Sequence, residues 1–491
     1  MPKENKSTRT RRKPCRVRVP VSFDPKLHLP PELRKHEDSA RYLLHKIIWG
    51  HVQRKQDLND YVPLKFDYLR EVIPDRVIKP LRLALEAAGV IQCDNHYIES
   101  HKSFGFRIGE RFQNDRIVEV TISNEVTAKK ITKMRRSKER KIRLDVHCWL
   151  RSKFRDLDID LSTATNILSS HRSFEAVKIP VEEIAAKDVA FSVCPYGRVH
   201  TPLTRLSKQV RRCLRVDGES LVNLDIANSQ PLFLALLMMN YRKRGSKTYG
   251  YITFKDNTVN PYKDIDSIIE QTVGSFISKK ENNSTTLHPL AITTRKASEK
   301  DSETLYLRAL KTTSSCPWEN TLNKKHLQQD ELLFVELCEQ GSLYKHLASV
   351  ADVPVRDWVK QQLFEVLFSK LHFHSPFKSA FIAEFPHVME VINAHKRKNH
   401  KHLAQLLQNI EANFIINNVG RKIMNEMPEA PIFTIHDSVL TTKQYVPQVN
   451  HIMEAEFASL GLTPRIKPEH YGTMAESDSG GPTESLVASV A

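Results

Sequence analysis

Two short apolar runs, far apart in the chain, each end at an aspartate. Residues 221–238 are LVNLDIANSQPLFLALLM, and residues 431–442 are PIFTIHDSVLTT. The apolar and β-branched residues that open each run predict a short buried strand, with Asp225 and Asp437 at the strand ends. Pro231 favours the start of a helix after Asp225, whereas a second apolar run after Asp437 predicts a tight turn and another strand.

An aspartate at a strand end is, taken alone, more often a turn former or a helix cap than a metal ligand. Two such carboxylates on neighbouring strands, however, provide the hard oxygen ligands that Mg²⁺ prefers. Two ions held there stabilise both the attacking and the leaving oxygen of a phosphoryl transfer. The pair therefore predicts a site for two Mg²⁺ ions, with Mn²⁺ as a substitute.

The N-terminal part of the chain has a helical period. The pattern predicts three helices, the last over residues 77–88 and closed by Gly89, and then two short strands around 90–93 and 103–108. Three helices followed by a β wing are the order of a winged helix-turn-helix domain, which we assign to residues 38–112. The third helix of such a domain enters the major groove of a specific duplex site, although winged helices also serve as protein-docking modules.

Positive charge is clustered along the 491 residues. Lys plus Arg number 74 against 57 for Asp plus Glu, which gives a net charge of +17 and favours a polyanionic partner. Residues 1–30 are predicted to be a basic disordered arm that lies on phosphates, carries a nuclear targeting signal or is simply solvated. Residues 120–190 are predicted to form a basic, thumb-like helical connector. Nine Lys or Arg between residues 129 and 143, opposed by Glu139 alone, favour contact with a phosphate backbone.

Composition is otherwise that of a soluble globular protein, with 40% hydrophobic and 27% charged residues. Seven scattered cysteines without a CxxC pair indicate a reducing compartment and argue against a zinc site. No apolar run reaches membrane-spanning length, which predicts a cytoplasmic protein, associated with the nucleoid in a bacterial host. Residues 241–330 are predicted to contain a polar surface insertion, and residues 473–491 a disordered tail.

A repeat of cations and aromatics lies between the two aspartates. Arg356, Lys360, Phe364 and Phe368 recur every four residues in VRDWVKQQLFEVLFSK, so a helix would present all four along one face. Two cations at one end of such a face can hold a triphosphate, and two aromatics at the other can stack on a base and sugar. Lys360 can also donate charge or a proton to a pyrophosphate leaving group.

These motifs, in this order, resemble the catalytic core of the family A DNA polymerases (the DNA polymerase I type) and of the single-subunit phage and mitochondrial RNA polymerases. The resemblance covers residues 191–472, a little over half of the chain, and includes Gly197 beside Arg198 ahead of the first aspartate. It implies catalytic roles for Asp225, Asp437 and Lys360, nucleotide binding by Arg356, Lys360, Phe364, Phe368 and Gln230, and primer–template binding by Arg198, Gln408 and His436.

Three positions depart from the DNA polymerase pattern. Ser438 follows Asp437 where DNA polymerases carry a second carboxylate, as in the phage RNA polymerases. Gln230 stands in place of the glutamate that blocks a ribose 2′-OH, and Phe368 replaces a tyrosine whose hydroxyl helps the RNA enzymes select ribonucleotides. The last two changes lean towards deoxynucleotides. Because the second carboxylate is missing, the expected metal ligands are Asp225, Asp437 and the carbonyl of Ile226.

The sequence thus predicts an α+β chain, with a right-hand polymerase core of palm and fingers behind an N-terminal winged helix. The predicted function is that of a DNA-directed DNA polymerase acting on a DNA primer–template and nucleoside triphosphates. No exonuclease pattern precedes the core, so proofreading is not expected. A winged helix joined to a small polymerase fits the replication of a mobile element, plasmid or phage. The alternatives are a primase or RNA polymerase that uses the same site, and a non-catalytic DNA-binding replication initiator.

Overall fold

The computed structural model describes residues 14–54, 57–98, 103–139, 142, 144–243, 324–353, 356–397 and 399–471, and the side chains of residues 137–139, 356 and 357 lie outside this description. The described chain contains both helices and sheets, and its strands pair antiparallel, as an α+β chain requires. The first thirteen residues of the expected arm, most of the expected polar insertion and the expected C-terminal tail lie outside the described residues.

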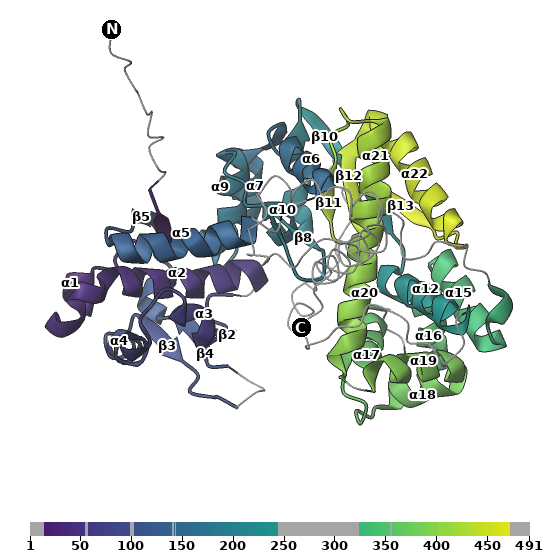
Figure 1. Ribbon diagram of the computed structural model, residues 1–491, viewed down its shortest axis with the longest axis horizontal. Helices are drawn as coiled ribbons and strands as arrows, with labels where there is room; N and C mark the ends of the chain where they lie inside the picture. The colour runs from purple at the N-terminus through teal and green to yellow at the C-terminus, as the bar shows by residue number, and fades with distance from the viewer. Residues whose placement is uncertain are drawn as a thin grey trace, which may run out of the picture.

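A six-stranded antiparallel sheet forms the centre of the C-terminal part of the molecule (Figure 1). Its strands are β6 (Leu157–Ile159), β9 (Leu214–Val216), β10 (Glu219–Ile226), β11 (Phe433–Ile435), β12 (Ser438–Thr442) and β13 (Ile466–His470). The order is β11-β12-β10-β9-β6, and β13 also pairs with β10. Asp217 and Gly218 join β9 to β10 with φ angles of 49° and 81°, the left-handed pair that Asp-Gly favours in a tight hairpin. β10 is therefore the strand around which the sheet is built.

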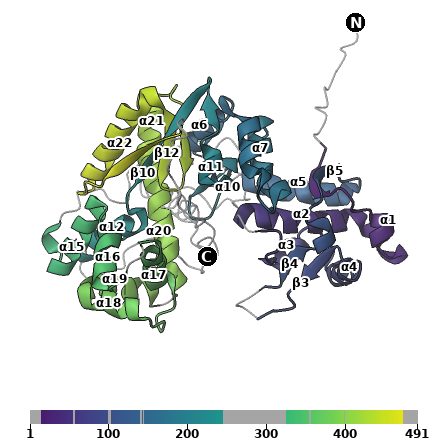
Figure 2. The same cartoon turned by 180° about the vertical axis from the view of Figure 1, so that it is seen from behind.

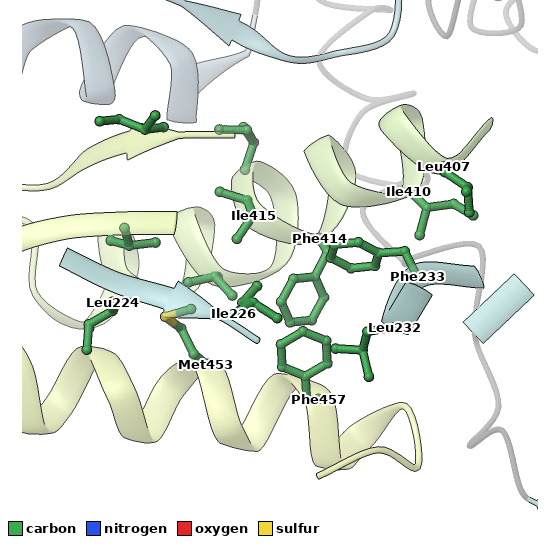
Figure 3. Packing of buried hydrophobic residues seen from close by; sticks show 14 of the residues in the cluster. Leu224, Ile226, Leu232, Phe233, Leu407, Ile410, Phe414, Ile415, Met453 and Phe457 are labelled. Carbon is green, nitrogen blue, oxygen red and sulfur yellow. The ribbon is translucent and has the colours of Figure 1, made fainter. Parts of the chain in front are cut away.

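Helices pack against one face of β10. They are α6 (Asp145–Lys153), the continuous run of α20 (Lys401–Asn413), the π-helix η4 (Phe414–Gly420) and α21 (Arg421–Glu426), and finally α22 (Val446–Ser459) after η5 (Lys443–Tyr445). Figure 3 shows Leu224 and Ile226 of β10 directed into this core. The rings of Phe414 and Phe457 lie 4.0 Å apart between centroids, at its centre. Because side chains alternate across a strand, Asp225 faces the opposite side of the sheet.

A group of helices lies beyond the sheet, at the lower right of Figure 1. It comprises α12 (Ser229–Lys243), η3 (Lys324–His326), α15 (Gln329–Gln340), α16 (Leu343–Val350), α17 (Arg356–Phe368), α18 (Pro376–Glu384) and α19 (Pro386–Lys396). α17 has the bounds of the predicted repeat. The Nζ of Lys396, which is buried, donates to the Val366 carbonyl at 2.9 Å and so ties the last turn of α17 to α19. Burial lowers the pKa of Lys396 to about 8.

The N-terminal module has its own hydrophobic core, drawn from residues 15–131 and completed by Ala176 and Ile179. Its elements are β1 (Arg16–Pro20), α1 (Pro25–His28), η1 (Pro31–His36), α2 (Glu37–Arg54), β2 (Val62–Pro63), α3 (Phe66–Arg70), α4 (Asp75–Ala87), β3 (Ile91–Cys93), β4 (Gly105–Ile108), η2 (Glu110–Phe112), β5 (Ile117–Thr121) and α5 (Glu125–Glu139). The three helices and the two strands after them follow the predicted order, and β2 adds a third strand in the order β2-β4-β3.

Gly89 ends α4 as predicted. Its φ is 66°, and the Val90 amide beyond it donates to the Leu85 carbonyl at 2.9 Å. A Cβ atom added to Gly109 would lie 1.9 Å from the Gly89 carbonyl oxygen, so only glycine allows the chain to pass this closely. The two glycines fix the position of the β3–β4 hairpin against the end of α4.

Two of the expected boundaries are wrong. Residues 16–20 belong to a buried strand, β1, that pairs with β5 from Arg16 opposite Thr121 to Pro20 opposite Ile117, and α1 follows, so this part of the expected arm is ordered. The expected connector is also divided: α5 packs on the N-terminal core, whereas the buried residues from Leu144 onward, apart from Ala176 and Ile179, pack in the core of the sheet, and β6 pairs with β9. The pairing partners lie tens of residues away along the chain, where no local period shows them.

Short elements link the two cores. They are α7 (Leu161–Ser169), α8 (Phe174–Val177), α9 (Ile179–Ala185), β7 (Ser192–Val193), β8 (Val199–His200), α10 (Pro202–Arg205) and α11 (Lys208–Arg211). The buried carboxylate of Glu183 accepts from Arg18 at 2.9 Å and from Arg205 at 2.6 Å, and the Arg205 guanidinium lies 4.6 Å from the ring centroid of Trp49. This network joins β1 and α2 of the N-terminal module to α9 and α10. Among the described residues, no helix is long and apolar enough to cross a membrane.

Candidate functional site

The two aspartates lie on adjacent strands. Asp225 is the penultimate residue of β10 and stands opposite Ser438 of β12, while Asp437 occupies the turn that joins β11 to β12. Since Ile435 pairs with Ser438, this turn has only two residues, His436 and Asp437. The strand–turn–strand reading of the sequence is confirmed here, and the two carboxylates share one end of the sheet.

The backbone is left-handed beside both aspartates, at two of the six non-glycine residues with positive φ in the part of the chain that the structure describes. Asn228, three residues after Asp225, has a φ of 54°, and His436, just before Asp437, has a φ of 55°. A left-handed conformation costs a non-glycine residue about 1–2 kcal/mol, and such residues gather at functional sites. Ser438 Oγ donates to the Ile435 carbonyl at 3.0 Å and closes the strained turn. The His436 ring lies edge-on to His200, with 6.1 Å between centroids.

The electrostatics of Asp225 favour a cation. Burial, followed by repulsion from Asp437, raises the pKa of Asp225 to about 7, and Lys360 opposes the rise. A divalent ion between the two carboxylates would relieve that repulsion, so these residues fit Mg²⁺. Within the described residues, no group of three His, Cys, Asp or Glu side chains could hold a metal, and further ligands would be backbone oxygens or water. Ile226, whose carbonyl is a predicted ligand, ends β10 opposite Ile466.

Lys360 of α17 interacts electrostatically with the site. Its positive charge lowers the pKa of Asp225, which places the exposed Lys360 ammonium within electrostatic range of β10. The Lys360 Nζ lies 5.9 Å from the ring centroid of Phe364, and the Phe364 and Phe368 rings are 5.7 Å apart. Both rings are half-buried. The structure therefore places three members of the predicted repeat on one face; Arg356 begins the helix, and its side chain lies outside the described residues.

A buried glutamate that the sequence analysis missed joins two of the predicted residues. The Arg198 guanidinium donates to Glu411 through Nε and Nη2, each at 2.8 Å, and the Gln230 amide donates to the same carboxylate. Glu411 is 1% exposed. Burial raises its pKa to about 7, against the attraction of Arg198, and Asp437 adds to the rise. Gly197, with a φ of 84°, turns the chain that presents Arg198.

A signal for Glu411 exists in the sequence. Leu403, Leu407 and Glu411 follow one another at intervals of four, so the glutamate continues an apolar stripe of α20, and both leucines are fully buried. A charge on a buried stripe needs a partner, and Arg198 provides it. Gln408, the predicted primer–template residue, is half-buried one turn before Glu411 on the same helix.

A second carboxylate was also missed. Glu469 of β13 stands opposite Asn223, one side-chain step from Asp225 on the same face of the sheet, and its charge adds to the raised pKa of Asp225. Lys208 lies 3.0 Å from Glu469, and Arg212 lies 3.9 Å from it. No motif marks this residue, because its place beside Asp225 follows from strand pairing alone.

Comparison with known proteins identifies no family. A scan against protein-family models and a search of curated proteins each gave no match.

The arrangement can support acid–base and metal chemistry on a polyanion. Two carboxylates lie at one end of a sheet, and the charge of a lysine on a helix lowers the pKa of one of them. An arginine and a glutamine share a buried carboxylate. Of the predicted residues whose side chains are described, Asp225, Asp437, Lys360, Arg198 and Gln230 are linked to one another by these contacts and charges.

Proposed function

We propose that the chain is a template-directed nucleotidyltransferase, a DNA polymerase without proofreading that extends a primer by phosphoryl transfer. One observation carries the proposal. Asp225 and Asp437 lie at the same end of two adjacent strands, and the charge of Lys360 on α17 lowers the pKa of Asp225. In a polymerase, the paired carboxylates of the palm and a cation on a fingers helix have this arrangement. The resemblance of the four motifs to family A polymerases adds support, because the motifs occur in the family's order.

In this proposal, Asp225, Asp437 and the Ile226 carbonyl would hold two Mg²⁺ ions, and these ions would supply Lewis-acid stabilisation to the attacking and leaving oxygens. Lys360 neutralises the triphosphate and can pass a proton to the departing pyrophosphate, since its ammonium is exposed and its charge acts on Asp225. Phe364 stacks on the incoming base beside it, with the cation close to its ring. Arg356 and Phe368 complete the nucleotide-binding face of α17.

Glu411 gives the proposed site its rigidity. Gln230 gates the sugar of the incoming nucleotide only if its amide is held in place, and the buried carboxylate of Glu411 holds it. The same carboxylate fixes Arg198 through two charge-assisted hydrogen bonds, so the primer–template and the nucleotide are positioned by one anchor. Gln408 lies one helical turn before Glu411, and His436 directly precedes Asp437. In this proposal both residues contact the primer–template.

The N-terminal module supports the DNA part of the proposal. Its helices α2, α3 and α4, with the sheet β2-β4-β3, have the element order of a winged helix. Arg76 and Lys79 are exposed on α4, the counterpart of a recognition helix. The module would hold a specific duplex site while the core extends a primer.

Primer extension on a DNA template with Mg²⁺ tests the proposal, with deoxynucleotides and ribonucleotides offered separately. We expect the native protein to extend the primer and Asp437→Ala to lose extension. Asp188→Ala is the matched control, because Asp188 is exposed and takes part in none of the contacts described for the site. Equal duplex binding by both proteins with no extension by either would overturn the proposal and favour a non-catalytic replication initiator.

The sharpest alternative is a primase or RNA polymerase with the same site. Ser438 favours it, because its hydroxyl is used within the turn and no second carboxylate follows Asp437. The same assay separates the two: ribonucleotide incorporation, or synthesis without a primer, would identify the alternative.

A further inference from the structure

The helix α5 has two faces of opposite character. Thr127 and Ile131 are buried in the N-terminal core, and Met134 packs against it. The side chains of Lys129, Lys133 and Arg136 are exposed. Spacings of four and three residues place these three cations along one face of the helix, over a length of about 10 Å. We define them as the α5 stripe.

The stripe has little local neutralisation. Lys129 lies 2.9 Å from Glu125, but both side chains are mostly exposed, at 67% and 82%, so the pair is weak. Among the residues that the structure describes, Lys133 and Arg136 have no acidic side chain within ion-pair distance. A row of cations with so little compensation, on a chain with a net charge of +17, attracts a polyanion.

The position of α5 connects the stripe to the proposed active site. α5 runs from the N-terminal module towards the sheet in both views of the molecule (Figures 1 and 2), and it contacts β7. β7 and β8 form the hairpin whose turn carries Arg198, the residue anchored on Glu411. The Arg18–Glu183–Arg205 network fixes the two cores at this junction. A strand bound along the stripe would therefore lead towards Arg198.

We propose that the α5 stripe is a binding site for the phosphate backbone of duplex nucleic acid, separate from α4, which guides the duplex to the active site. The inference rests on the proposed function. A length of about 10 Å spans about three phosphates of one strand of a duplex. The whole helix, EVTAKKITKMRRSKE, lacks aromatic residues, so it has no platform on which unpaired bases could stack. Duplex is therefore the expected ligand, and binding should be independent of sequence.

Salt dependence of binding tests this proposal. We would titrate a fluorescent DNA duplex of arbitrary sequence, and the matching single strand, with the full chain and with Lys133→Gln/Arg136→Gln. Loss of two phosphate contacts should lower the slope of log affinity against log salt by about 1.8 for the duplex. The native protein should then lose about tenfold more affinity than the variant between about 50 and 200 mM salt.

Lys26→Gln/Lys35→Gln is the matched control. It removes the same charge from exposed lysines of the same module, one on α1, at the end away from the sheet in Figure 1, and one on η1, which contacts α1. It should leave the duplex slope within a few tenths of the native value. Equal slopes for the α5 variant and the native protein would overturn the proposed role of the α5 stripe. An equal decrease in slope in both double variants would overturn it as well. A loss seen only with the single strand would also refute the duplex assignment.

The outcome is independent of catalysis. Asp437→Ala should bind the duplex with the native slope whether or not it extends a primer. If the native protein fails to extend any primer but the α5 variant still has the lower slope, the proposed function fails and the stripe stands. If extension depends on Asp437 while the slopes are unchanged, the stripe fails and the proposed function stands.

Discussion

Replacing Asp225 by asparagine should stabilise the metal-free protein. The carboxylate of Asp225 is partly buried and faces the charge of Asp437, and these two effects raise its pKa from the ordinary 3.8 to about 7. The folded state therefore disfavours the ionised form that the unfolded chain adopts freely. Asparagine has nearly the same shape and no charge, so the variant lacks this penalty.

The magnitude follows from the linkage between protonation and folding. Because the folded pKa lies above the unfolded one, the penalty is absent below about pH 4, grows as the unfolded carboxylate ionises, and is complete above about pH 7. A difference of about three pKa units corresponds to about 4 kcal/mol, and partial solvation of the side chain lowers the expected range to about 2–4 kcal/mol. The stability of the native protein relative to Asp225→Asn should fall by this amount between pH 4 and pH 8.

Urea unfolding of both proteins at a series of pH values, with a chelator present, measures this difference. The comparison cancels the titration of other groups, including His51 and His147, whose burial lowers their pKa to about 4 in both proteins. Adding Mg²⁺ should then stabilise the native protein much more than the variant, since only the native site has the paired carboxylates. Mn²⁺ should act in the same way.

Two results would refute this reasoning. If Asp225→Asn is no more stable than the native protein at pH 8 without metal, the carboxylate is not under the strain that burial and Asp437 imply. If Mg²⁺ stabilises both proteins equally, the ion binds elsewhere. Asp188→Asn serves as the control for the loss of one exposed carboxylate, and its stability should stay within about 0.5 kcal/mol of the native value at all pH values.

Two further substitutions probe the neighbours of the aspartates. Glu411→Leu leaves the Arg198 guanidinium without its partner and should lower the free energy of unfolding in urea by about 3 kcal/mol. The double variant with Arg198→Met should recover most of this loss. If the single variant is within about 1 kcal/mol of the native protein, the result contradicts the buried pair. Lys360→Met keeps the side-chain stem over Phe364 but removes the charge, so primer extension should slow by about 10²-fold with folding unchanged; an unaltered rate would exclude Lys360 from the reaction.

The sequence predicted the elements that carry strong local signals. The strand that carries Asp225 near its end, the tight turn at Asp437 and the helix of Lys360 follow from apolar runs and from a four-residue repeat. The helix stop at Gly89 follows from the conformational freedom of glycine. Each of these signals is contained in fewer than about twenty neighbouring residues, which is the range over which periodicity acts.

The missed features depend on contacts between distant residues. β1 gains its place only by pairing with β5, about a hundred residues later, and β6 has three residues, too few for a period to emerge. Glu411 continues the apolar stripe of α20, but its partner, Arg198, lies more than two hundred residues earlier in the chain and is brought to it only by the fold. Glu469 likewise becomes part of the site only because β13 pairs with β10. Tertiary pairing decides these positions, and a single sequence does not encode it locally.

Two hairpin turns of the same sheet show where the fold departs from its most stable form. The β9–β10 turn uses Asp217 and Gly218, residues suited to their left-handed angles, whereas the β11–β12 turn forces His436 into the same region. Two carboxylates nearby, Asp225 and Glu411, have pKa values raised to about 7. These costs do not help the sheet to form. Their coincidence at one end of β10 is expected if that end is maintained for binding and chemistry, with the core around Phe414 and Phe457 supplying the stability that offsets them.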